Sequence, residues 1–67
     1  MKLLSAITYD KDDQPIGILE TPMYPCIFYA GYITNRNGWV PRSNATSLFH
    51  RTIAEAKAAI AAGRIHF

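Results

Sequence analysis

The feature that most constrains the fold is the lack of any means of cross-linking in a very short chain. The sequence has 67 residues and one cysteine, Cys26, so no internal disulfide can form, and no Cys/His spacing typical of a zinc site is present. A chain of this size buries only about 60% of the surface that its unfolded form exposes. Because 49% of the residues are hydrophobic and 18% are charged, we expect one packed core, a single domain over residues 1–67 and little spare stability. Association with a second copy as a homodimer, or with another partner, is the remaining way to add stability.

Several segments have the residue pattern of β-strands. The most β-prone run is apolar on both faces and is predicted to be the central strand, and Gly31 within it predicts a bulge or a close approach by the helix. Asn37 and Gly38 tolerate the positive φ angles of a tight hairpin turn. A polar run ending in Pro15 predicts an exposed turn between the first two strands. We predict strands at residues 3–9, 16–20, 26–34 and 39–40.

The end of the sequence predicts a helix with signals at both ends. Thr52 and Glu55 form a capping box, and Gly63 follows a run of strong helix formers, residues 53–62. At helical spacing one face carries Ile53, Ala56, Ala59, Ile60 and Gly63, and the tail after it has two apolar residues, Ile65 and Phe67, that we expect to fold back on the core. The predicted fold class is therefore α+β: a small antiparallel sheet of three to four strands packed on one C-terminal helix.

The beginning of the sequence and the overall charge bear on location and partners. The first residues contain no apolar stretch of signal-peptide length, and no run approaches the roughly 20 apolar residues that a membrane span needs. We therefore expect a cytoplasmic protein that does not engage a membrane. A net charge of +2 permits nucleic acid as a partner without requiring it.

Metal binding and catalysis are both disfavoured by the sequence. Asp10, Asp12 and Asp13 are similar to the opening of a calcium loop, but Pro15 stands where that loop needs glycine and Thr21 where it needs glutamate, so we expect a solvated turn.

Cys26 lies in the most apolar part of the chain, where burial makes a thiol unreactive. Neither His50, which we expect on the surface, nor His66 has a carboxylate at a suggestive spacing, and no glycine-rich phosphate loop is present. We predict no catalytic residue, no metal, no cofactor and no enzymatic activity.

The number of aromatic residues favours a binding protein. Tyr and Trp are the side chains that most often anchor interfaces, and the aromatic set exceeds what one small helix can cover: Tyr9, Tyr24, Phe28, Tyr29, Tyr32, Trp39, Phe49 and Phe67. If Tyr29 and Ile33 point with Ile27 toward the helix, the alternation of strand side chains turns Phe28, Tyr32 and Thr34 away from it, and Trp39 can join them across the hairpin.

We therefore predict a protein-binding module with an aromatic sheet face, whose binding residues are Phe28, Tyr32 and Trp39 with Arg36 and Arg42 beside them. The alternative is a nucleic-acid-binding protein, in which the same rings stack on bases and the arginines contact phosphates.

One segment also carries a resemblance. Residues 49–60, from Phe49 through the capping box to Ile60, resemble the strand-to-helix ending of small bacterial and phage-encoded proteins, including some anti-CRISPR and host-takeover inhibitors. The resemblance implies a phage or prophage accessory protein that blocks a host complex by binding it. It assigns no role to any individual residue.

Overall fold

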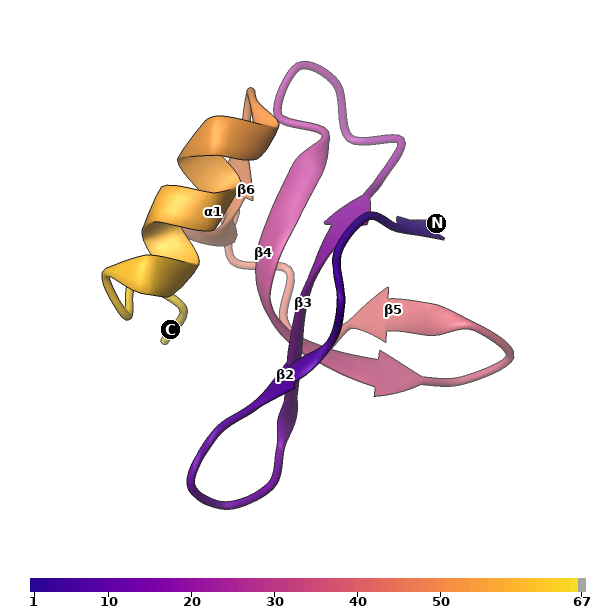
Figure 1. The fold of residues 1–67 in the computed structure, drawn as a ribbon. Coiled ribbons are helices and arrows are strands. Elements are labelled where there is room, and N and C mark those ends of the chain that lie inside the picture. The colour runs from indigo at the N-terminus through magenta and orange to yellow at the C-terminus, as the bar shows by residue number, and fades with distance from the viewer. Residues whose placement is uncertain (67) are drawn as a thin grey trace.

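A computed structural model describes residues 1–66 and has an α+β architecture built around one long strand (Figure 1). The elements, in chain order, are β1 (Lys2–Leu3), β2 (Thr8–Tyr9), β3 (Pro15–Glu20), β4 (Phe28–Asn35), β5 (Trp39–Pro41), a 3-10 helix (Thr46–Leu48), β6 (Phe49–His50) and α1 (Ile53–Ala61). All strand pairs are antiparallel. The sheet and its single C-terminal helix confirm the predicted fold class.

The sheet has four strand positions, and each outer position is shared by two short strands. β3 and β4 are the central pair, with Leu19 opposite Tyr29. β1 and β2 both pair with β3 on one side, and β5 and β6 both pair with β4 on the other. The strand predicted at residues 3–9 is thus interrupted, because Leu3 lies opposite Leu19 but Thr8 lies opposite Ile16. Four residues of the outer strand, 4–7, therefore face only two residues of β3 and bulge away from it.

Each face of the curled sheet carries a buried cluster, so neither face is left wholly open as an aromatic binding face would require. On the α1 side, Ile18 and Ala30 form a cluster with Ala56 of the helix. On the other side, Tyr29 and Ile33 pack in a second cluster with other buried residues, Leu19, Leu48 and Phe49. The orientation considered from the sequence, with Tyr29 and Ile33 toward the helix, is therefore not the one observed. The segment between β5 and β6, for which no strand or helix was predicted, supplies Leu48 and helps to close the second face.

Two glycines permit the curl. Gly17 and Gly31 lie directly opposite each other on the second face. A Cβ on Gly31 would stand 3.0 Å from the hydroxyl oxygen of Tyr29 and 3.2 Å from Cζ of the same ring. The close approach at Gly31 is thus made by the ring of Tyr29 in the same strand, and not by the helix as predicted. The Tyr29 hydroxyl then donates a hydrogen bond to the carbonyl of Tyr32.

The helix begins and ends where the sequence predicts. Thr52 Oγ1 accepts a hydrogen bond from the Glu55 N–H at 3.1 Å, although the Glu55 carboxylate accepts from the N–H of Arg51 and not from that of Thr52. Gly63 has a φ of +73° and ends the helix in a left-handed cap.

The predicted apolar stripe holds at Ala56, Ala59 and Ile60 but is wrong at Ile53, which is 41% exposed. In the tail, Ile65 is buried against the sheet as predicted, whereas Phe67 lies outside the described residues. Within residues 1–66, no helix combines the length and the apolar character needed to cross a membrane.

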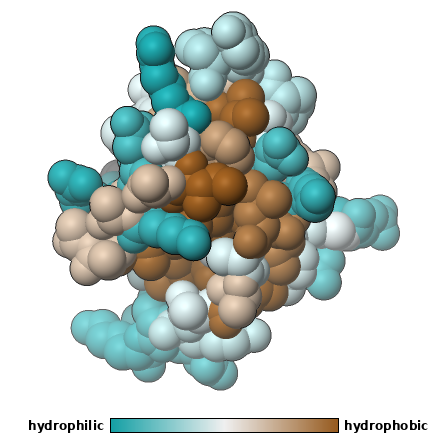
Figure 2. All heavy atoms as spheres, turned by 45° about the horizontal axis from the view of Figure 1, so that its top comes forward, coloured by the Kyte–Doolittle hydropathy of each residue, from teal (hydrophilic) through white to brown (hydrophobic). Residues whose placement is uncertain are grey.

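Apolar side chains also reach the surface. Figure 2 shows a face on which they gather in the middle, with polar side chains around the rim. The large apolar residues that are most exposed are Met1, Tyr9, Met23, Tyr24 and Ile53. Tyr29, Phe49 and Trp39 are absent from this set because they pack on the second face of the sheet, and Phe28 is half-buried on the α1 side.

Candidate functional site

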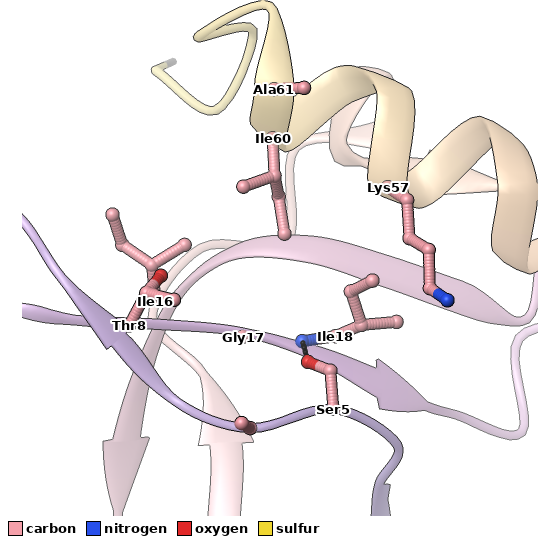
Figure 3. A pocket seen from close by; sticks show the side chains of 9 residues that line it. Ser5, Thr8, Ile16, Gly17, Ile18, Lys57, Ile60 and Ala61 are labelled. Carbon is pink, nitrogen blue, oxygen red and sulfur yellow. Dashed lines mark hydrogen bonds between the residues drawn. The ribbon is translucent and has the colours of Figure 1, made fainter.

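An apolar groove lies between the helix and the interrupted outer strand. It has a volume of about 230 Å³. We call it the α1 groove, and define it by its lining residues: Ser5, Ala6, Thr8, Ile16, Gly17, Ile18, Lys57, Ile60 and Ala61. Figure 3 shows Ile60 and Ala61 on the helix side and Ser5 and Thr8 on the strand side, with β3 between them.

The bulge of the outer strand forms one wall of the groove. The Leu4 N–H still donates to the Ile18 carbonyl at 2.9 Å, but the N–H of Ile18 is accepted by Ser5 Oγ at 3.2 Å and not by a backbone carbonyl. The Ser5 side chain thus provides the hydrogen-bond acceptor for the Ile18 N–H at the point where the backbone of the outer strand has moved away. Gly17 adds no side chain to the lining, and Ala61 contributes only a methyl group from the helix side. Hence the groove remains unfilled by the residues around it.

Lys57 is the one charged residue that lines the groove. It is exposed and extends from α1 toward the sheet on the Ile18 side of the groove (Figure 3). Within residues 1–66 its ammonium group takes part in no hydrogen bond with another side chain or the backbone. The groove therefore combines an apolar floor with a single cation at one end.

The predicted aromatic binding face is not assembled as one surface. Phe28 is half-buried and packs against the cluster on the α1 side, whereas Trp39 is half-buried and packs against the cluster on the opposite side. Strand alternation places Tyr32 on the same side as Phe28, because the two are four residues apart in β4. Of the five predicted binding residues, the structure brings together Tyr32 with Arg42, and Arg42 with Arg36.

Tyr32 is the centre of a polar cluster that ties the first hairpin loop to β4 and β5. Its hydroxyl donates to Asp10 Oδ2 at 2.7 Å, and the guanidinium carbon of Arg42 lies 5.4 Å from the centre of its ring. The Asp10 Oδ1 accepts from the N–H of Gln14 at 2.9 Å, and Arg42 donates to the Gln14 side chain at 3.2 Å. These contacts give the acidic turn a structural role.

The hydrogen bonds of this cluster move two pKa values in opposite directions. The N–H of Gln14, followed by the hydroxyl of Tyr32, holds the pKa of Asp10 below its ordinary value of 3.8. The same bond to Asp10, followed by burial, raises the pKa of Tyr32 above 10.0. The ionised carboxylate and the neutral phenol are therefore the forms that the fold stabilises.

Arg36 and Arg42 line a second, more polar hollow with a volume of about 180 Å³. Thr34, Val40 and Pro41 complete its lining on the β4–β5 hairpin. Asn37 and Gly38 turn this hairpin with positive φ angles of 54° and 116°, as predicted from the sequence. The hairpin and the residue that follows it therefore place two exposed arginines in the lining of one hollow.

Cys26 and His50 belong to opposite sides of the sheet. Cys26 is half-buried and packs against the second-face cluster. His50 lies opposite Phe28 and so points to the α1 side, where its Nε2 is buried and has no hydrogen-bond partner among residues 1–66. The expectation of a surface histidine is thus wrong for His50. In the described part of the chain no group of three or more His, Cys, Asp or Glu side chains is placed to hold a metal ion.

The α1 groove was not foreseen because its cause lies in the pairing of strands. Residues 3–9 alternate as an unbroken strand would, and only the change of register between Leu3 and Thr8 reveals the bulge. The one available signal is Ser5, a side chain able to accept a strand hydrogen bond in place of a carbonyl.

Comparisons of the chain with protein-family models, with curated proteins and with solved structures found no match.

Proposed function

We propose that this chain is a small, non-enzymatic protein-binding module that receives an apolar side chain of its partner in the α1 groove. The observation that carries the proposal is the groove itself, an apolar hollow of about 230 Å³ between α1 and the outer strand. The resemblance of residues 49–60 adds a more specific form of the proposal, in which the module is a phage or prophage accessory protein that inhibits a host complex.

The size and lining of the groove favour a protein side chain over a small ligand. Pockets for small molecules and cofactors usually have about 300–1,000 Å³ and several convergent polar groups. The α1 groove is smaller, and the Ser5 hydroxyl in its lining already accepts from Ile18. Interfaces concentrate their binding energy in a few large side chains that fill pockets of this kind.

A groove-filling substitution tests the proposal. Ala61 is exposed and lines the groove, so Ala61→Trp should fill it without disturbing the core. Ala58 is exposed on the same helix but does not line the groove, and Ala58→Trp is the matched control. Wild type, A61W and A58W are immobilised and exposed to a bacterial lysate. We expect a protein that is retained by wild type and A58W and lost by A61W. Equal retention by all three variants would contradict binding at the groove.

The homodimer is a separate proposal that rests on the small size of the core. A second copy of the chain is one candidate for the occupant of the α1 groove, and A61W should then weaken dimer formation. Sedimentation at high micromolar concentration distinguishes the states, and a 7.5 kDa species there would contradict self-association.

Nucleic-acid binding is the second candidate function, and one observation favours it. Arg36 and Arg42 line the same polar hollow, and Arg42 lies over the ring of Tyr32. Such a pair of cations beside an aromatic ring suits phosphate contact with a neighbouring base. Arg42 also donates to Gln14, so part of its hydrogen-bonding capacity is used within the fold.

Salt dependence separates this candidate from protein binding. Labelled single-stranded oligonucleotides are titrated with wild type and with Arg36→Gln at two salt concentrations. A nucleic-acid binder should lose affinity steeply with salt, and R36Q should reduce that salt slope by about 1. The absence of binding at low salt would contradict this candidate and leave the groove proposal in place.

A further inference from the structure

The outer strand has open backbone groups at the point where it lines the α1 groove. Ser5, Ala6 and Ile7 lie between β1 and β2, and within residues 1–66 their N–H and carbonyl groups make no backbone hydrogen bond. This segment is at the edge of the sheet, with β3 on its other side. Open groups on a strand edge are a template for pairing with another extended chain.

The groove has two chemically different ends along this edge. Figure 3 shows Ile60 reaching toward the sheet between Ile16 and Ile18, with Ala61 above it on the helix, and shows Lys57 on the Ile18 side. Ser5 lies at that same side, because its hydroxyl accepts from the Ile18 N–H. A strand lying along residues 5–8 would present every second side chain to the helix side. One such side chain would meet the apolar end of the groove, and the next would meet the ammonium group of Lys57.

The spacing of the helix matches the spacing of a strand. Lys57 and Ala61 are four residues apart in α1, which corresponds to about 6 Å along a helix axis. Side chains on one face of a strand repeat every two residues, or about 6.8 Å. A carboxylate two positions from an apolar side chain can therefore reach Lys57, which has no salt-bridge partner within the described residues.

We infer that the partner segment in the α1 groove is an extended strand that carries an apolar side chain with an acidic residue two positions away. It adds to the sheet edge at Ser5, Ala6 and Ile7, inserts the apolar side chain near Ile60 and Ala61, and pairs its carboxylate with Lys57. This inference rests on the proposed function, since it names the chemistry of the partner that the groove receives.

Peptide titrations test the inference. The probe is acetyl-Thr-Glu-Thr-Phe-Thr-Glu-Thr-amide, which is prone to the extended conformation and has a carboxylate two positions from the phenyl ring on each side. The first comparison peptide replaces both Glu residues with Gln, and the second keeps them but N-methylates its backbone to prevent strand pairing. Binding is followed by the amide chemical shifts of the protein, for wild type, Lys57→Gln and Arg64→Gln. Arg64 is an exposed cation that does not line the groove, so R64Q is the control for charge.

The inference predicts shift changes at residues 5–8 and 57–61, with affinity for the Glu peptide up to about fivefold higher than for the Gln peptide, the scale of one exposed ion pair. K57Q should abolish this preference and R64Q should keep most of it, while the N-methylated peptide should not bind. Equal affinity for Glu and Gln peptides, or binding of the N-methylated peptide, would overturn the inference but leave the groove as a docking site. Absence of shifts in the groove with every peptide would also overturn it. In each of these cases the proposed function is decided separately by the A61W capture experiment.

Discussion

The contact between Tyr29 and Gly31 gives a prediction that can be worked out in detail. Gly31 lies in β4 with an ordinary negative φ, so alanine in open space there would stabilise the protein by about 0.5–1 kcal/mol. The space is not open, because the new Cβ would stand 3.0 Å from the Tyr29 hydroxyl oxygen and 3.2 Å from Cζ. The ring is fully buried and its hydroxyl is bonded to the Tyr32 carbonyl, so it cannot move aside. Overpacking of this kind costs about 1–3 kcal/mol, and we expect Gly31→Ala to destabilise the protein by about 1–2 kcal/mol.

The cause can be isolated by a double-mutant cycle. Tyr29→Phe removes the hydroxyl donor, but the Tyr32 carbonyl still accepts from the Arg42 N–H at 3.0 Å. The loss of this one hydrogen bond should cost about 1 kcal/mol. In the double variant the hydroxyl oxygen nearest the new Cβ is absent, although Cζ remains. The double variant should therefore be more stable than the sum of the single effects predicts, with a coupling of about 1 kcal/mol. Urea unfolding followed by the fluorescence of Trp39, the only tryptophan, measures all four proteins.

Gly17 supplies the control for this cycle. Its added Cβ would meet Cδ1 of Ile33 at 2.9 Å and Cδ1 of Leu3 at 3.3 Å, both at the ends of aliphatic side chains. Gly17→Ala should therefore combine additively with Tyr29→Phe. A neutral or stabilising Gly31→Ala, or additivity between Gly31→Ala and Tyr29→Phe, would refute the view that the tyrosine ring dictates glycine at this position.

Three further predictions concern the cap, the buried histidine and the acidic turn. Thr52→Ala should lower the free energy of unfolding by about 1 kcal/mol because Glu55 N–H loses its acceptor; T52S is the control, and an unchanged midpoint for T52A would contradict the cap. His50→Phe should raise the free energy of unfolding by about 1 kcal/mol, since Nε2 is buried with no partner in the described chain; a clear loss of stability would show that the imidazole has an unrecognised role. The lowered pKa of Asp10 favours its ionised form in the fold, so its contribution is present above its ordinary value of 3.8 and is lost as the pH falls through the lower folded value. Asp10→Asn should therefore unfold at lower urea than wild type at neutral pH, with a difference that shrinks below pH 3.8, and a difference that stays constant with pH would contradict this assignment.

Elements with local signals were predictable from the sequence. Thr52 and Gly63 set the helix ends through backbone groups within a few residues of each, and Asn37 and Gly38 set the hairpin through their own φ angles. These features depend on neighbours in the chain, so a single sequence contains what is needed to place them.

The faces of the sheet were not predictable, because both faces of β4 are apolar. Tyr29 and Ile33 on one side and Phe28 and Ala30 on the other are all suited to burial, so alternation alone cannot identify the side on which α1 packs. The outcome depends on small contacts between distant segments. Ala30 allows the close approach of Ala56, whereas Tyr29 needs the deeper space beside Phe49, where the ring centres are 5.3 Å apart. The face of β4 on which α1 packs can be identified only when both α1 and the segment between β5 and β6 have been placed against the sheet.

The segment between β5 and β6, which covers the face of the sheet opposite α1, changes the surface that remains for a partner. Burial of Tyr29 and Phe49 and partial burial of Trp39 use aromatic area that the sequence had suggested for an interface. Closing that face leaves the α1 side, where nine helical residues made mostly of alanine cannot cover the whole sheet. The uncovered strip is the one beside the bulge of residues 4–7, and its lining is mostly apolar, with Lys57 as its charged residue. The partner surface that follows from this packing is therefore a narrow groove with a free strand edge, and a partner that fits it must contribute the large side chain itself.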